Sequence, residues 1–282
     1  MAFHVRRHPD AAAFLERAEA WLMRAEAEHN LVLGLARELA GSAGGYASPI
    51  YWATVEADGA VAGCAFRTPP YKLGLTRMPL GALPALADDV GAVYEALPAV
   101  LGPEPEVRTF AALWEQRTGA RGTPGARQRI YQLDAVLPPV PPPPGALRRA
   151  QPADQDLAAA WLAAFEAEAG VHSGDAHALA AKLIGRQALY FWEDGEPVTM
   201  AGWTGRTPNG ARVGYVYTPP AFRRRGYATA CVAALSQHLL DGGLAFCFLY
   251  TDLANPTSNS IYQQIGYRPL CDVMDYDFAP VG

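Results

Sequence analysis

A cluster of arginines precedes a helix-forming segment in the second half of the chain. The first turn of a helix leaves backbone N–H groups unpaired and carries partial positive charge, so it can bind an anion. A glycine lets the backbone approach that anion closely, and arginines add bidentate donors. Three solvated arginines before an ordinary helix are the alternative interpretation. The segment predicts a pyrophosphate site formed by Arg223, Arg224, Arg225, Gly226, Tyr227, Ala228 and Thr229.

The common sequence signatures of nucleotide and hydrolase sites are absent from the chain. It contains no GxxxxGK[ST] loop and no GxGxxG turn that opens a helix after a strand. It also lacks HExxH and GxSxG. We therefore expect the pyrophosphate to be bound neither in a Walker loop nor in a Rossmann turn.

Two segments in the second half of the chain resemble motifs of one family. Arg223-x-x-Gly226-x-Ala228 resembles the (Q/R)xxGx(G/A) coenzyme A motif of the GNAT acetyltransferase superfamily. The segment from Asn255 through Asn259 and Tyr262 to Gly266-Tyr267 resembles the second signature of that superfamily. Residues 216–269 are most similar to the subgroup that includes glycine N-acyltransferase-like domains. The resemblance implies acetyl-CoA as co-substrate, no metal, and an N-acetyltransferase that uses acyl groups other than aminoacyl.

The resemblance also implies roles for single residues. Tyr262 stands where this family carries the acid that protonates the departing thiolate, and a phenol of pKa ~10 can donate to a thiolate of parent pKa ~8.5. A half-buried core aromatic is the alternative for Tyr262. Asn255 is equally plausible as a helix cap. The family pairs the backbone at the end of its fourth strand with pantetheine, and its asparagines with the cofactor arm, which gives Val216, Tyr217, Thr218, Asn255 and Asn259.

No residue can be singled out as the base. The strand before the arginines contains no acid, although an amine of pKa ~10 must lose a proton before it attacks. His172 and His177 are five residues apart and point ~140° away from each other on a helix, so a helix start near Asp175 is favoured over a metal site. The candidates are Glu166, Glu168, His172, Asp252 or water.

The elements that must position these residues occur twice along the chain. Residues 51–66 and 189–203 each predict an aromatic-rich strand, an Asp-Gly turn and a second strand. Alanine-rich helical sequence precedes both hairpins, at residues 11–24 and 154–168. The second half then predicts strand, helix, strand, helix and strand. We interpret the pattern as a tandem duplication, although chance recurrence of a common hairpin is the competing explanation.

A proline-rich stretch, residues 137–145, divides the chain. We predict domains at residues 1–136 and 146–282, with this stretch as linker. The fold class is α/β (α+β): two tandem GNAT-like domains, each a mixed, mostly antiparallel sheet flanked by helices. In the first domain Gly102-Pro-Glu-Pro-Glu106 is expected to replace the anion turn with acids, so that this copy is degenerate and holds no coenzyme A. We expect a solvated face formed by Asp88, Asp89, Glu104 and Glu106, with attraction of a cationic amine as the alternative.

Composition limits the classes of protein and partner that remain possible. The chain has 282 residues, 50% hydrophobic and 18% charged, with a formal charge of −5, which disfavours nucleic acid as a partner. The four cysteines are scattered, and no apolar run is long enough to cross a membrane, so we expect a cytoplasmic protein. We expect it to be a monomer or a homodimer. The predicted activity is transfer from acetyl-CoA to a small-molecule amine acceptor by direct transfer. A non-catalytic coenzyme A-binding regulatory module and an acyltransferase for longer acyl-CoA are the alternatives.

Overall fold

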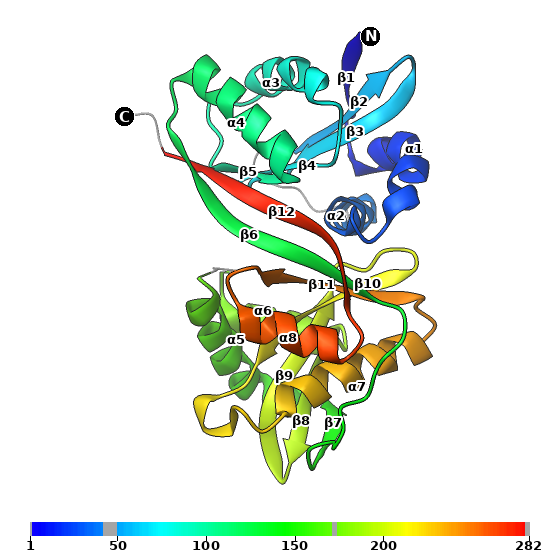
Figure 1. The fold of residues 1–282 in the computed structure, drawn as a ribbon, viewed down its shortest axis with the longest axis vertical. Helices are drawn as coiled ribbons and strands as arrows, with labels where there is room; N and C mark the ends of the chain where they lie inside the picture. The colour runs from blue at the N-terminus through cyan, green and yellow to red at the C-terminus, as the bar shows by residue number, and fades with distance from the viewer. Residues whose placement is uncertain (1, 42–49, 171–173, 280–282) are drawn as a thin grey trace. The chain divides into compact units, whose positions relative to one another are not determined.

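The computed structural model describes residues 2–41, 50–170 and 174–279 and divides into two compact units (Figure 1). Unit 1 comprises Met1–Ile130, Asp252–Ala254 and Leu270–Gly282, and unit 2 comprises Tyr131–Thr251 and Asn255–Pro269. The proline-rich stretch thus lies inside unit 2, where the Trp192 indole N–H donates to the Pro144 carbonyl at 2.8 Å. The units have boundaries different from those of the division into 1–136, 137–145 and 146–282, which stays a prediction.

The elements repeat in the same order in the two halves of the chain. The first repeat consists of β1 (Phe3–Arg7), α1 (Ala11–Leu22), α2 (Asn30–Ala40), β2 (Tyr51–Ala57), β3 (Ala60–Arg67), β4 (Leu73–Leu75), α3 (Leu83–Gly91), β5 (Ala99–Gly102), α4 (Glu104–Thr118) and β6 (Gly122–Leu133). The second consists of β7 (Ala146–Arg149), α5 (Gln155–Ala169), α6 (Ala176–Gly185), β8 (Leu189–Asp194), β9 (Glu196–Thr204), β10 (Gly210–Tyr217), α7 (Tyr227–Asp241), β11 (Phe246–Asp252), α8 (Pro256–Gln264) and β12 (Arg268–Phe278). Both predicted hairpins are present, and the predicted order of the second half is confirmed, with β7 as an additional first strand.

Each repeat ends with a strand that is shared with the other unit. In unit 1 the strand order is β1-β2-β3-β4-β5-β12-β6, and in unit 2 it is β6-β11-β10-β9-β8-β7, because β6 has residues in both. The last strand of the chain, β12, pairs antiparallel with β5, from Met274 opposite Gly102 to Asp277 opposite Ala99. Met274 and Phe278 complete the unit 1 core between the sheet and α3 and α4. Each unit therefore contains strand residues from both halves of the chain.

In unit 2 helices cover both faces of the sheet. Alternate residues of β8 and β9 point to opposite faces: Phe191 and Met200 pack with α5 and α6, and Tyr190 and Ala201 pack with α7 and α8. The same alternation in unit 1 places α1 and α2 against Trp52 and Phe66. Each unit is therefore a helix–sheet–helix sandwich with a core on each side of its sheet.

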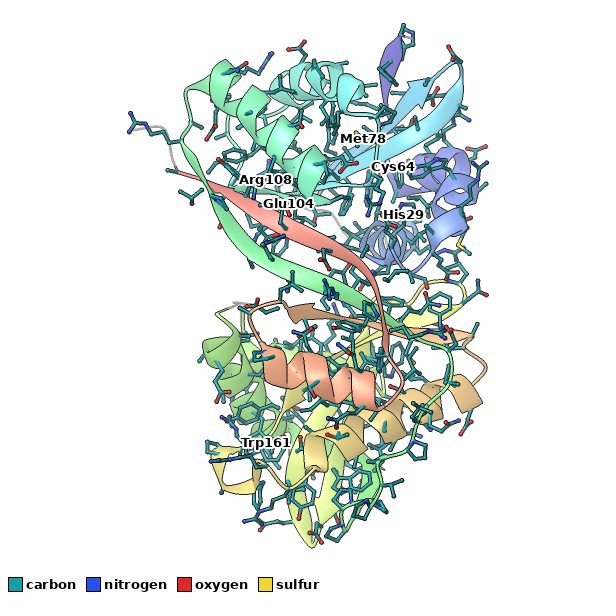
Figure 2. The ribbon with its side chains drawn as sticks, viewed as in Figure 1. His29, Cys64, Met78, Glu104, Arg108 and Trp161 are labelled. Atoms are coloured by element: carbon teal, nitrogen blue, oxygen red, sulfur yellow. The ribbon has the colours of Figure 1, made fainter. Side chains whose placement is uncertain are left out.

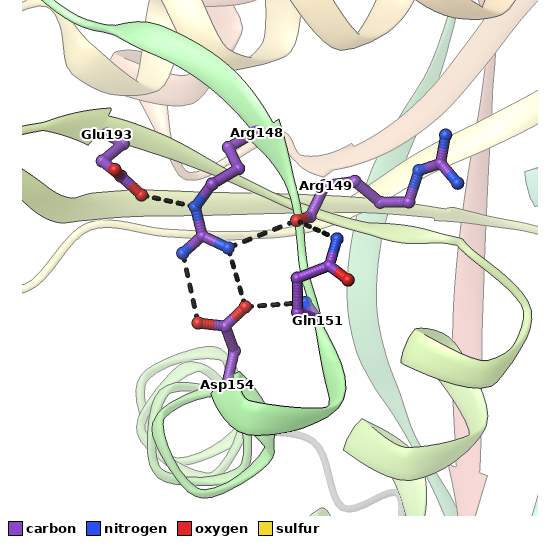
Figure 3. Close-up of polar contacts among 5 residues, drawn as sticks. All are labelled: Arg148, Arg149, Gln151, Asp154 and Glu193. Atoms are coloured by element: carbon purple, nitrogen blue, oxygen red, sulfur yellow. Dashed lines mark hydrogen bonds and ion pairs between the residues drawn. The ribbon is translucent and has the colours of Figure 1, made fainter.

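One arginine fixes where α5 begins (Figure 3). Arg148 of β7 binds the Asp154 carboxylate with two nitrogens, at 2.8 and 3.1 Å, and also binds Glu193 of β8. Asp154 in turn accepts the Gln151 N–H at 2.6 Å, which closes a capping box before the helix. The hydrogen bond from Arg148 is the main cause of the lowered pKa of Asp154. This network orients α5, whose inner face carries the acid discussed below.

Candidate functional site

A bulge interrupts β10 close to its end. Gly214 pairs with Gly202 and Tyr217 pairs with Met200, so three steps on β10 match two steps on β9. The bulge holds Tyr215 at φ +52°, in the left-handed region that non-glycine residues rarely adopt. Val216 lies in the same interruption, between the paired positions. The backbone pairing of β10 with β9 is therefore interrupted where the sequence predicts contacts with pantetheine.

On the other edge, β10 separates from β11. Their parallel pairing joins residues 210–212 to residues 246–248. Beyond Arg212 and Phe248 no pairing joins these strands in the described chain, although β10 continues to Tyr217 and β11 to Asp252. Unpaired backbone on such an edge can bind an extended polar chain as an added strand would. The splay between β10 and β11, with Val216 on its edge, is the first part of the candidate site.

The next two predicted backbone positions are already engaged. The Tyr217 carbonyl accepts the Thr199 hydroxyl at 2.7 Å, and the Thr218 carbonyl accepts Arg223 Nε at 2.8 Å. The Thr218 hydroxyl lies 2.7 Å from the Thr199 hydroxyl. These contacts hold the end of β10 in place, so the structure leaves Val216 as the freest of the three predicted backbone positions.

The arginine segment forms a turn directly before α7. Arg224 has φ +61° and Gly226 has φ +79°, and no side chain of the described residues caps the helix. Its first N–H groups, on Tyr227, Ala228 and Thr229, have no partner within the helix. The predicted strand–turn–helix is thus present, with its open N–H groups at the positive end of the helix dipole. Gly226 is required by its φ, because a Cβ there would meet only Pro143 Cγ at 3.9 Å.

The three arginines are not equivalent. Arg223 Nη2 lies 2.6 Å from Glu168 Oε1, so Arg223 links the turn to α5 and its charge is compensated. Arg224 and Arg225 are exposed, and the Arg225 guanidinium lies 6.0 Å from the Phe222 ring centre. The Tyr227 hydroxyl donates to Asp194 at 2.6 Å, which is the main cause of its raised pKa. Arg223 is thus engaged with Glu168 in this structure, and its predicted contact with pyrophosphate stays a prediction.

Tyr262 lies on α8 against the core that α7 covers. Its ring packs edge-on against Tyr267 at 5.9 Å, and burial raises the pKa of Tyr262 to about 12. The described residues supply no hydrogen-bond partner for its hydroxyl. A half-buried phenol with an uncommitted O–H remains protonated at neutral pH and can donate to a developing thiolate. Both interpretations of Tyr262 therefore fit, core aromatic and proton donor.

The two asparagines have partners within the chain. Asn255 Oδ1 accepts the Ser258 N–H at 3.0 Å, as a helix cap does. Asn259 Nδ2 donates to the Asn255 carbonyl at 2.7 Å, and its Oδ1 accepts the hydroxyl of Tyr131 at 2.9 Å. The cap interpretation of Asn255 is the one present. Sequence reasoning missed Tyr131, which gives no local signal because it lies 128 residues before Asn259.

Among the base candidates, Glu166 differs from the rest. It is 7% exposed on α5, and its buried Oε1 has no hydrogen-bond partner among the described residues. Glu168 is paired with Arg223, and Asp252 is exposed and accepts the Ala254 N–H at 2.8 Å. His172 lies outside the described residues. A buried carboxylate oxygen without a hydrogen-bond partner costs free energy, and Glu166 is the one described base candidate with such an oxygen.

Asp175 and His177 belong to a helix start, as predicted. Asp175 Oδ1 accepts the N–H groups of His177 and Ala178, at 2.8 and 3.3 Å, and so caps α6. In the part of the chain that the structure describes, no three His, Cys, Asp or Glu residues are grouped for a metal ion. Within the same residues, no helix has the length and apolar character needed to cross a membrane.

Unit 1 corrects the position of the degenerate turn. By element order, the counterpart of the arginine turn is residues 76–82, between β4 and α3, rather than Gly102–Glu106, which begins α4. There the Glu106 carboxylate accepts the N–H of Met78 at 3.2 Å. Figure 2 labels Met78. A Cβ on Gly102 would lie 2.6 Å from the Leu75 carbonyl oxygen, so β4 and β5 stay close where β10 and β11 separate. Glu106 is buried, and Asp89 accepts the hydroxyl of the buried Tyr51 at 2.7 Å besides contacting Arg7, so neither lies on the expected solvated face. The other two acids contact exposed arginines: Asp88 with Arg117, and Glu104 with Arg108 and Arg127.

Comparisons with known proteins agree with this arrangement. The family model of FR47-like proteins matches residues 191–274, which include the bulge, the arginine turn and α8. An acetyltransferase of the GNAT family from Colwellia psychrerythraea is 12% identical, with a TM-score of 0.61 over 98% of this chain and 100% of that chain. The fold is that of tandem GNAT proteins.

Two further solved structures support that assignment. A GCN5-related N-acetyltransferase from Sphaerobacter thermophilus is 20% identical, with a TM-score of 0.61 over 97% of this chain and 94% of that chain. A tandem GNAT protein from the clavulanic acid biosynthesis pathway is 13% identical, with a TM-score of 0.54 over 100% of both chains. The search of curated proteins gave no match. At these identities the likeness establishes the GNAT fold alone.

Proposed function

We propose that unit 2 is a coenzyme A-dependent N-acyltransferase that moves an acetyl group directly to a small amine. One observation carries the proposal: β10 separates from β11 immediately before a glycine-containing turn that leaves the N-terminal N–H groups of α7 uncapped. Val216 on the edge of the splay would pair with pantetheine, and the turn would bind pyrophosphate. The similarity to the glycine N-acyltransferase-like subgroup stays part of this proposal.

The residues present fit such a ligand. Arg224 and Arg225 are exposed beside the turn and supply positive charge, while Arg223 holds the turn to Glu168. A backbone N–H of the bulge would donate to the thioester oxygen as negative charge develops on it. Tyr262 would give its proton to the leaving sulfur, and the raised pKa keeps that proton available.

Titration calorimetry with acetyl-CoA, after removal of any copurified coenzyme, tests the donor site. We expect one site per chain, weakened at least tenfold when Arg224 and Arg225 are both replaced by alanine, because each can form a charged hydrogen bond. Two sites per chain would show that unit 1 also binds. Absence of binding would overturn the proposal.

Thiol release then separates catalysis from binding. Acetyl-, octanoyl- and benzoyl-CoA are compared with a panel of amines at saturating donor. Release of coenzyme A that depends on the amine, fastest with the acetyl donor, is expected. Binding with no release for any amine would favour a regulatory coenzyme A-binding module, and faster release with octanoyl-CoA would overturn the acetyl assignment.

A further inference from the structure

The proline-rich stretch of residues 137–145 passes beside the arginine turn of unit 2. It leads from β6 to β7 and is drawn in green in Figure 1. Among the described residues, the only atom within 4 Å of a Cβ on Gly226 is Pro143 Cγ, at 3.9 Å. Pro143 is half-buried, whereas Pro142 and Pro144 on either side of it are exposed. The ring of Pro143 thus lies against the turn at the glycine that would approach the pyrophosphate.

Strand β8 fixes the end of this stretch. The Trp192 indole N–H donates at 2.8 Å to the carbonyl of Pro144, the residue that follows Pro143. Gly145 has φ +106°, and a Cβ on it would lie 2.6 Å from Trp192 Nε1. Only glycine can pass β8 so closely. The two residues after Pro143 are therefore held against β8.

Few bond rotations separate Pro143 from that anchor. The pyrrolidine rings fix φ in both Pro143 and Pro144, so only ψ angles remain free between the Pro143 ring and the bonded Pro144 carbonyl. The hydrogen bond at Pro144 therefore sets the position of the Pro143 ring closely. Neither proline carries a charge or an N–H group, so neither can donate to a phosphate. Their contribution to the site is the position of the turn.

The same end of β8 holds the first residue of α7. The Tyr227 hydroxyl donates to Asp194 at 2.6 Å, and the rings of Tyr227 and Trp192 belong to one core. Gly226, which precedes Tyr227, thus has the Pro143 ring beside it and a fixed helix start after it. Glycine has wide conformational freedom, so these contacts restrict a residue that its own backbone does not restrict.

We propose that Pro143, Pro144 and Gly145 form a brace for the anion turn. Pro143 is the positioning residue, which keeps Gly226 and the first N–H groups of α7 directed at the coenzyme pyrophosphate. The inference rests on the proposed binding of coenzyme A by unit 2. Without the brace the turn would populate other conformations, and the apparent Kd rises as the fraction of competent turns falls. A competent fraction of about one third to one tenth weakens binding about 3- to 10-fold.

Pro143→Ala tests the brace, and Pro142→Ala is its matched control. Each substitution removes one ring from the same stretch and loosens the unfolded chain to the same degree, but Pro142 does not reach Gly226. In calorimetry we expect Pro143→Ala to raise the Kd for acetyl-CoA about 3- to 10-fold and Pro142→Ala to leave it unchanged within about twofold. Equal Kd values for the two variants would overturn the proposal.

A double-mutant cycle with Gly226→Ala separates a brace from a general effect on the fold. In Gly226→Ala the turn has already relaxed, so adding Pro143→Ala should change the Kd by less than about twofold. A further loss of about 3- to 10-fold in the double variant would show that Pro143 acts independently of the turn and would overturn the inference. The thermal midpoints of Pro143→Ala and Pro142→Ala should fall by similar amounts. A larger fall for Pro143→Ala, together with additive losses of affinity, would assign Pro143 to the stability of the fold.

Gly145→Ala tests whether β8 sets the position of Pro143. The added Cβ would displace the chain from Trp192 and leave the Pro143 ring intact, so the Kd for acetyl-CoA should rise by a similar factor at a temperature where the variant is folded. An unchanged Kd would overturn the anchoring by β8. Failure of the wild-type protein to bind acetyl-CoA would overturn the proposed function itself, whereas wild-type binding with unaffected variants would overturn the brace alone.

Discussion

Gly226 gives a direct test of the anion turn because unit 2 contains a matched glycine away from the site. Gly226 has φ +79° and Gly195, in the β8–β9 hairpin, has φ +75°. A Cβ on Gly195 meets nothing within 4 Å, and one on Gly226 meets a single atom at 3.9 Å. Each Gly→Ala substitution therefore costs only the left-handed backbone, about 1–2 kcal/mol. Equal losses of thermal stability are expected.

The two variants should differ in ligand binding alone. An alanine at 226 relaxes towards negative φ and turns the N–H groups of Tyr227 to Thr229 away from their present direction. Loss of one charged hydrogen bond to phosphate, about 1.5–3 kcal/mol, weakens acetyl-CoA binding about 10- to 150-fold. Calorimetry at a temperature where both variants are folded measures it. Unchanged affinity in Gly226→Ala, or an equal loss in Gly195→Ala, would refute the reasoning.

Four other substitutions give expected outcomes. Arg225→Ala should weaken acetyl-CoA binding by about 1.5–3 kcal/mol in calorimetry, and unchanged affinity would leave the backbone as the anion ligand. Tyr262→Phe should lower kcat about 10²–10⁴-fold in steady-state assays with an unchanged Kd for acetyl-CoA, whereas a parallel loss of both would assign Tyr262 to binding. Arg148 lowers the pKa of Asp154 in the folded state, so this ion pair stabilises the fold above the unfolded-state pKa of Asp154, and the stabilisation is lost as the pH falls through the folded-state pKa. In urea unfolding, the stability of Arg148→Met should therefore fall less between pH 6 and pH 2 than that of the wild-type protein. Phe278→Ala should destabilise unit 1 by about 3–5 kcal/mol in chemical unfolding, although Phe278 is near the C-terminus, and no effect would contradict its place in that core.

Local patterns predicted the elements of unit 2 and the arginine turn. Asp58-Gly59 and the glycine of Asp194-Gly195 adopt the positive φ of a hairpin turn, because that conformation is a property of the residues themselves. Gly226 has the same local origin. The start of α8 at Asn255 could likewise be predicted, since a cap bonds to its own helix. These features depend on interactions within a few residues.

Features that depend on distant parts of the chain could not be predicted in this way. The pairing of β12 with β5 joins segments separated by most of the sequence, and no local signal distinguishes it from pairing within the second repeat. Arg223 is predicted as a phosphate ligand from its motif position, but its partner Glu168 lies 55 residues earlier, on α5. Burial of Glu166 likewise follows from how α5 packs on the sheet. The motif thus predicts which residues gather at the turn before α7. Tertiary packing decides which of their polar groups remain free to bind a ligand.

Comparison of the two repeats explains why only one is expected to bind coenzyme A. Both have a short parallel strand pair, β4 with β5 and β10 with β11. In unit 1 the close approach of Gly102 to the Leu75 carbonyl keeps that pair together, and the Glu106 carboxylate already accepts the Met78 N–H in the turn. An internal anion at this place repels a second one and removes a donor that phosphate would need. In unit 2 the carboxylates of Glu168 and Asp194 bind the side chains of Arg223 and Tyr227 and not the backbone N–H groups at the start of α7. The proposed coenzyme A site therefore combines an open strand edge with an uncapped helix start.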